Sequence, residues 1–91
     1  MSIYRLEPLY PNNPQWWLAA TYGKVVWVAA NSPDEARAII ARKTAIVREA
    51  ASFASRLPSP WLEEDLARCV PDLEMEEMPP GTAMTEEGTF L

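Results

Sequence analysis

The sequence predicts a small α+β domain in which an antiparallel sheet of three or four strands packs against one main helix. Three observations lead to this prediction: an apolar run over residues 25–30, a helix start signal directly after it, and short alternating segments on both sides. The expected order is three strands, the main helix, an optional second short helix and a last strand. Residues 1–76 form the expected domain, and residues 77–91 are expected to be an acidic, flexible C-terminal tail.

The first strands are read from alternation and turn residues. Residues 3–7 alternate like a half-buried strand, with Tyr4 and Leu6 on one face. The prolines at positions 8, 11 and 14 predict a loop after it. A second strand is expected over residues 15–21. Gly23 favours a tight turn, which predicts a hairpin between residues 16–21 and 25–30.

The main helix has the clearest start signal. Ser32 stands at the N-cap position, Pro33 at the first helical position, and Asp34 and Glu35 in the first turn. Ser32 and Glu35 also have the spacing of a capping box. An apolar stripe then extends toward residue 56 and comprises Ala36, Ile39, Ile40, Val47, Ala50 and Ala54.

Lys43 interrupts this apolar stripe. Its side chain either extends outward along its aliphatic stem, or the helix kinks or ends near residues 42–44. The two alternatives stay open at this level.

Two further elements are expected after the main helix. Ser59 and Pro60 repeat the start signal and predict a short helix from residue 60 to about residue 68. Residues 68–76 alternate like a strand, and Pro71 confines such a strand to a sheet edge.

Charge is distributed unevenly along the chain. Residues 1–60 carry seven basic and four acidic side chains, a net +3, and residues 61–91 carry one basic and nine acidic side chains, a net −8. No apolar segment is long enough to span a membrane, and the N-terminal residues lack the pattern of a signal peptide. We therefore expect a cytoplasmic protein that does not bind membranes.

The residue types needed for common catalytic and metal sites are missing from the sequence. There is no histidine, which excludes imidazole metal ligands and histidine-activated nucleophiles. Cys69 is the single cysteine, so a disulfide framework and a multi-cysteine zinc site are excluded, and we expect a small buried apolar side chain there. We expect no enzymatic activity, no cofactor and no metal.

The predicted hairpin suggests a contact surface. If Val26 and Val28 face the helix, Trp17 and Trp27 lie on the opposite sheet face. We therefore expect a non-catalytic module that binds a protein partner, or a second copy of itself, through this aromatic face. The predicted contact residues are Trp17, Tyr22, Trp27, Glu74, Glu76 and Glu77. The alternative is that the tail or the second helix covers these aromatic side chains.

Two other functions are compatible with the charges. The acidic C-terminal third suggests an inhibitor that occupies the basic nucleic-acid-binding surface of a partner. A third reading is weak nucleic-acid binding through the basic side chains of the main helix, but the sequence pI of about 4.6 argues against it. A strand followed by a capped helix that opens with Asp-Glu-Ala-Arg occurs in many unrelated small bacterial domains and identifies no family.

Overall fold

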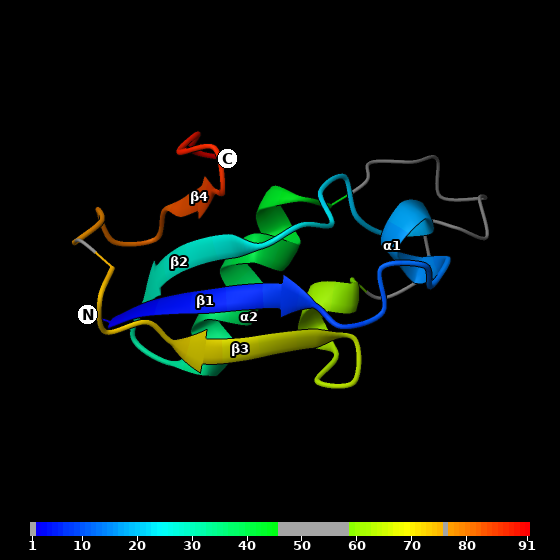
Figure 1. Cartoon of the computed structure of the whole chain (residues 1–91), viewed down its shortest axis with the longest axis horizontal. Helices are drawn as coiled ribbons and strands as arrows, with labels where there is room; N and C mark the ends of the chain where they lie inside the picture. The colour runs from blue at the N-terminus through cyan, green and yellow to red at the C-terminus, as the bar shows by residue number, and fades with distance from the viewer. Residues whose placement is uncertain (1, 46–58, 76) are drawn as a thin grey trace.

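Four antiparallel strands and one main helix make up the fold in the computed structural model, which describes residues 2–45, 59–75 and 77–91. The elements in chain order are β1 (Ser2–Pro8), α1 (Gln15–Leu18), β2 (Val26–Ala30), α2 (Pro33–Lys43), the 3₁₀ helix η2 (Pro60–Leu62), β3 (Ala67–Pro71) and β4 (Ala83–Thr85). The strand order is β3-β1-β2-β4, and α2 lies behind the sheet (Figure 1). The predicted α+β class is confirmed.

Side chains alternate between the two faces of the sheet. Tyr4 and Leu6 of β1 lie on the face toward α2, as predicted, next to Val26 and Val28 of β2. On this side α2 contributes Ala36, Ile39 and Ile40 to the core. The residues between them in β1 and β2 therefore point to the opposite face, called the outer face below.

The predicted strand over residues 15–21 is wrong, and so is its hairpin with residues 25–30. Residues 15–18 form the short helix α1, and β2 pairs with β1 instead. The N-cap of α1 is Pro14, and just before it Asn13 forms a local turn in which its Oδ1 accepts a hydrogen bond from the backbone N–H of Gln15 at 2.9 Å. Trp16 is buried and meets the ring of Trp61 edge to face, with the ring centroids 4.7 Å apart. This distant partner outweighs the strand preference of the aromatic residues.

The start of α2 is confirmed. Ser32 Oγ accepts a hydrogen bond from the backbone N–H of Glu35 at 3.1 Å. Glu35 Oε1 accepts in return from the N–H of Asn31, one residue before the cap, at 3.3 Å. Two of the backbone donors around the helix start are thus satisfied by side chains.

The structure decides between the two alternatives for Lys43. Helix α2 ends at Lys43, and Thr44 closes it by donating its hydroxyl to the carbonyl oxygen of Ile40 at 2.8 Å. Lys43 is exposed and donates to the main-chain oxygen of Leu91 at 3.3 Å. The further stripe positions Val47, Ala50 and Ala54 lie outside the described residues.

The second helix is shorter than predicted. Ser59 caps η2 by accepting from the N–H of Trp61, which confirms the predicted start. The element ends at Leu62, because Glu63 adopts an extended conformation with φ −97° and ψ 119°. A helix to residue 68 is wrong, since Ala67 already belongs to β3.

Strand β3 is an edge strand, as its proline predicts, but the strand expected over residues 68–76 is wrong beyond Pro71, because the chain turns at Asp72. β3 pairs with β1, and the N–H of Asp72 donates to the carbonyl oxygen of Ile3 at 2.8 Å. Hydrogen-bonded pairs alternate along an antiparallel ladder, so the next pair, Tyr4 and Pro71, is a non-bonded pair. The missing N–H of Pro71 therefore faces the free edge, where it removes no ladder bond.

Part of the segment expected to be a tail forms the fourth strand. β4 pairs with β2 in the register Trp27 to Met84, and the chain then turns at Gly88, whose φ is +82°. The N–H of Leu91 donates to the carbonyl oxygen of Ala83 at 2.9 Å. In the described ranges, no helix combines the length and the apolar character needed to cross a bilayer.

Candidate functional site

The outer face of the sheet carries a second, smaller apolar cluster. Ile3 of β1 and Ala29 of β2 are cross-strand partners on this face, and both are buried. Met78 covers them from the C-terminal segment and is itself 7% exposed. Trp27, Met75 and Met84 pack around this cluster and stay partly exposed.

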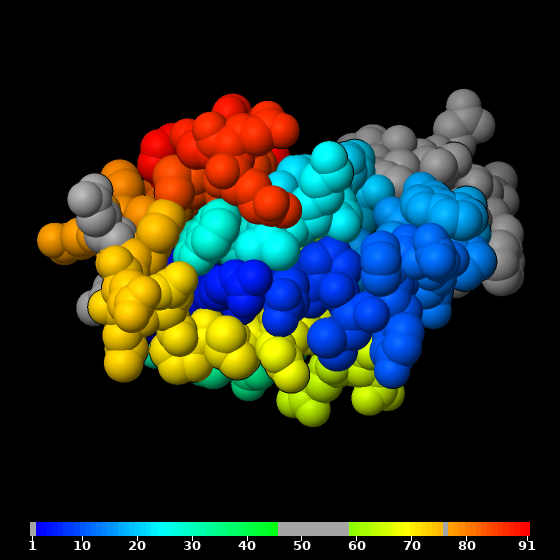
Figure 2. All heavy atoms as spheres, in the orientation of Figure 1, coloured from blue at the N-terminus to red at the C-terminus, as the bar shows by residue number. Residues whose placement is uncertain are grey.

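This cluster forms the floor of a groove at one end of the sheet. Two adjoining hollows of about 380 and 320 Å³ share Met75, Glu77 and Met78 as lining residues. Together they extend from Ile3 and Ala29 to Met84 and Phe90. We call this surface the methionine groove and define it by Ile3, Ala29, Met75, Met78, Met84 and Phe90. Figure 2 shows the yellow and orange segments of the C-terminal third beside the blue and cyan strands that carry it.

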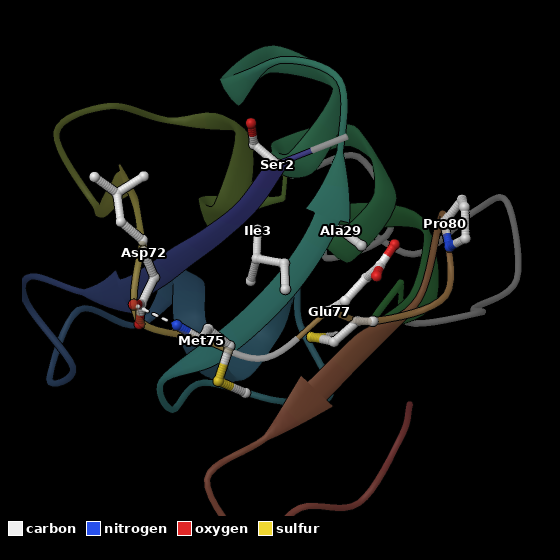
Figure 3. A pocket seen from close by; sticks show the side chains of 9 residues that line it. Ser2, Ile3, Ala29, Asp72, Met75, Glu77 and Pro80 are labelled. Atoms are coloured by element: carbon white, nitrogen blue, oxygen red, sulfur yellow. Dashed lines mark hydrogen bonds between the residues drawn. The ribbon is translucent and has the colours of Figure 1, made fainter.

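A tight turn after β3 forms one wall of the groove. Asp72 Oδ1 accepts hydrogen bonds from the backbone N–H groups of Glu74 and Met75, at 3.0 and 3.1 Å (Figure 3), and so fixes the turn from which Met75 packs against the cluster. Asp72 Oδ2 accepts from the indole N–H of Trp27 at 2.9 Å. One carboxylate therefore joins the turn to the outer face of β2.

The hydrogen bonds at Asp72 also affect its ionisation. They lower the pKa of Asp72 below its usual value, chiefly through the Trp27 indole N–H and then through the N–H groups of Glu74 and Met75, with a smaller contribution from the charge of Arg5. The carboxylate is therefore ionised at neutral pH and adds a fixed negative charge to the wall.

All charged side chains among the described residues that line the groove are acidic. Asp72 and Glu77 line the groove, and Glu77 takes part in both hollows. Residues 72–91 contain six acidic side chains and no Lys or Arg. On the neighbouring outer face, by contrast, Glu7 is paired with Arg5 at 3.3 Å and with Arg68 at 3.5 Å. The groove therefore lies at the acidic end of a face whose other charges are paired.

The structure brings some of the predicted contact residues to this groove. Glu77 lines it, Trp27 packs beside its floor, and Glu74 is exposed in the turn that forms its wall. Glu76 lies outside the described residues. The prediction that Trp27 points away from the helix-facing side of the sheet is confirmed.

Trp17 and Tyr22 lie elsewhere. Trp17 belongs to α1, which is not part of the sheet, and is 64% exposed. Tyr22 packs against the helix-side core and donates its hydroxyl to the carbonyl oxygen of Val25 at 2.9 Å. Trp17, Tyr22 and Trp27 therefore do not form one aromatic face, because the hairpin that would have aligned them is absent.

Sequence reasoning missed the methionines that shape the site. Met78 and Met84 lie in residues 77–91, predicted to be a flexible tail, and Met75 lies at the end of the strand predicted over residues 68–76. A usable signal was present in β1: if Tyr4 and Leu6 face the helix, Ile3 faces outward and needs a cover. Nothing local in the sequence says that Met78 provides it.

Among the described residues, no three His, Cys, Asp or Glu side chains gather as a metal site. Burial raises the pKa of the half-buried Cys69 thiol, an effect that Arg37 opposes and Asp34 reinforces. This thiol is protonated at neutral pH and is a poor nucleophile.

Comparisons with protein-family models, curated proteins and solved structures found no significant match to this chain.

Proposed function

We propose that the protein is a non-catalytic interaction module that binds an apolar segment of a protein partner, flanked by Lys or Arg, in the methionine groove. The observation that carries this proposal is the composition of the groove. Three methionines and Phe90 line it, and the charged lining residues in the described ranges are the carboxylates Asp72 and Glu77.

The methionine side chains suit such a role. A thioether chain has three flexible torsions and a polarisable sulfur, so it adapts its shape to different apolar side chains. Each hollow is near the lower end of the volumes that hold small ligands, about 300–1,000 Å³. The groove therefore has room for a few anchoring side chains of a partner.

The charges select the kind of partner. The exposed Glu74 and Glu77 would attract Lys or Arg on either side of the apolar anchor, which speeds association and disfavours acidic partners. Nucleic acid and anionic membranes would be repelled by the same carboxylates.

In this proposal the two tryptophans have different roles. Trp27 acts as a positioning residue, because its indole N–H holds Asp72 and with it the turn that carries Met75. Trp17 is outside the groove, and its role as a contact residue stays a separate prediction.

The proposal can be tested before any partner is identified. Peptides would be selected from a random library on the immobilised full chain, and the Kd of the selected peptides measured for two charge-reversal variants. Glu77→Lys reverses a charge that lines the groove, and Glu64→Lys makes the same change on an exposed residue that lines neither hollow.

We expect the selected peptides to share an apolar anchor with flanking Lys or Arg. Glu77→Lys should raise the Kd of these peptides by about fivefold or more, and Glu64→Lys should raise it by less than about twofold. Selected peptides without basic residues, or an equal response to both variants, would contradict the proposal.

A second function is favoured by the acidic C-terminal segment. Glu86 and Glu87 are exposed on the turn after β4 and extend the negative charge beyond the groove. The protein would then inhibit a basic nucleic-acid-binding partner through charge alone. Replacing Glu86 and Glu87 by Gln should abolish such an inhibition, whereas Met75→Ala should leave it unchanged. The groove proposal requires the opposite pattern.

Nucleic-acid binding through α2 has less support. Arg37 donates to the carbonyl oxygens of Trp61 and Glu63, at 3.1 and 3.4 Å, so it is engaged within the fold. Lys43 donates to Leu91, Arg42 is exposed, and Arg48 lies outside the described residues. We therefore do not propose this function.

A further inference from the structure

We infer that the segment bound in the methionine groove is a basic amphipathic helix rather than an extended strand. This inference rests on the proposed function and specifies the conformation of the partner. Its basis is the use of the backbone hydrogen-bonding groups around the groove.

A partner that binds as an added strand needs a row of free backbone groups on its host. Along the groove, most of the described backbone N–H groups already donate hydrogen bonds within the protein or are absent. The N–H groups of Glu74 and Met75 donate to Asp72 Oδ1, and that of Gly81 donates to the carbonyl oxygen of Ala29 at 2.9 Å. Pro79 and Pro80, in the middle of the same wall, have no N–H at all.

The edges of the sheet next to the groove do not supply such a row either. The edge of β4 is occupied by the chain's own last residues, through bonds from Leu91 N–H to the oxygen of Ala83 and from Thr85 N–H to the oxygen of Thr89, at 2.9 and 2.8 Å. The edge of β3 ends in Pro71, whose ring faces outward. A strand bound here would leave its own backbone groups unpaired, which is unfavourable in a desolvated groove.

A helix avoids this cost because its backbone groups bond to each other. It presents apolar side chains at positions i, i+3, i+4 and i+7 as one stripe, which could place anchors in both adjoining hollows, on either side of the shared Met75 and Met78. Its Lys and Arg side chains, on either side of this stripe, then reach Asp72 and Glu77. The used backbone groups favour a helix over a strand, and the carboxylates favour a basic one.

The test uses the full chain and three synthetic peptides of about 14 residues, since shorter helices are marginal in water. The first has leucines at the helical spacing above and lysine and alanine elsewhere. The second differs by one central alanine replaced by proline, which disfavours a helix but tolerates an extended chain. The third has the same composition with the leucines placed on all sides. Calorimetry would give the Kd, and circular dichroism the helix content.

We expect the first peptide to gain helix content on binding and to bind at least about tenfold more tightly than the other two, because proline interrupts the helix of the second and the third presents no apolar stripe. Glu77→Lys should raise the Kd of the first peptide by about fivefold, and Glu64→Lys should leave it unchanged.

The outcomes separate the two claims. Equal binding of the proline peptide would overturn the helical inference while the response to Glu77→Lys still supports the groove. If the first peptide does not bind, the inference is also overturned, and the library selection then decides independently on the proposed function. Equal weakening by Glu77→Lys and Glu64→Lys would overturn both.

Discussion

Trp16 and Trp61 contact each other in the core, but their indole N–H groups have different environments. The N–H of Trp61 donates to the carbonyl oxygen of Tyr22 at 3.1 Å, whereas that of Trp16 is buried and has no hydrogen-bond partner in the described structure. A buried donor without a partner costs free energy, and a satisfied one contributes modestly. The same substitution should therefore have unequal effects at the two positions.

We expect Trp61→Phe to reduce the free energy of unfolding by at least about 1 kcal/mol more than Trp16→Phe. Both variants lose ring area, but Trp61→Phe also leaves the oxygen of Tyr22 unpaired, whereas Trp16→Phe removes an unsatisfied donor. Urea unfolding of both variants measures the difference. Equal losses would mean that the indole of Trp16 is hydrogen-bonded in solution.

The bond between Trp27 and Asp72 makes a prediction about pH. The folded pKa of Asp72 is lowered, so its contribution to stability is complete above the ordinary aspartate pKa of about 3.9 and is lost as the pH falls through the lower folded value. In Trp27→Phe the largest cause of this shift is absent. A carboxyl NMR titration should therefore show the pKa of Asp72 rising toward the ordinary value.

If the pKa of Asp72 is the same in the wild-type protein and in Trp27→Phe, the indole bond is not formed in solution, and Trp27 does not position the turn.

At the level of elements, the segments with local causes were predicted well. Helix α2 starts at its predicted cap because Ser32 and Glu35 satisfy nearby donors themselves. The position of β1 and the face of each of its side chains were predicted correctly, because alternation alone determines which of its residues meet the helix. α1 was missed because its cause is contact with Trp61, 45 residues along the chain from Trp16.

The last strand gives an element-level prediction. Deleting residues 77–91 removes β4 together with the buried Met78 and Ala83, so the free energy of unfolding should fall by more than about 2 kcal/mol. Thermal or urea unfolding of the truncated chain measures this. A full-length variant with Glu86→Ala and Glu87→Ala controls for the loss of exposed charge and should retain its stability. A truncated chain as stable as the full chain would show that the segment is a solvated tail.

At the scale of the whole molecule, the two candidate contact surfaces lie at opposite ends of the sheet (Figure 1). The methionine groove is near the start of β1, and α1 with the exposed Trp17 is near its end. A partner segment in the groove therefore leaves Trp17 uncovered.

This separation can be read from tryptophan fluorescence. Trp17 is 64% exposed, while Trp16 is 4% and Trp61 0% exposed. Acrylamide should therefore quench chiefly the emission of Trp17, and Trp17→Phe should remove most of the quenchable fraction, whereas Trp61→Phe should not. A fall in quenching at higher protein concentration would indicate self-association through the surface of α1. Strong quenching that persists after both Trp17→Phe and Trp27→Phe would contradict the described arrangement, because Trp16 and Trp61 are buried whereas Trp27 is partly exposed.

The sequence by itself determined the α+β class, the start of α2, the faces of β1 and β2, and the edge position of β3. These features depend on side chains within a few residues of each other: a cap, an alternation or a proline. It also showed that a histidine-dependent site is excluded and that the acidic charge is concentrated in the C-terminal third.

Only the tertiary structure decided that residues 15–18 are helical, that β2 pairs with β1, and that methionines from the C-terminal segment cover the outer face. Each of these depends on contacts between residues far apart in the chain, such as Ile3 and Ala29 with Met78. Burial of apolar surface is non-directional, so a local pattern indicates that Ile3 needs a cover but not which segment supplies it.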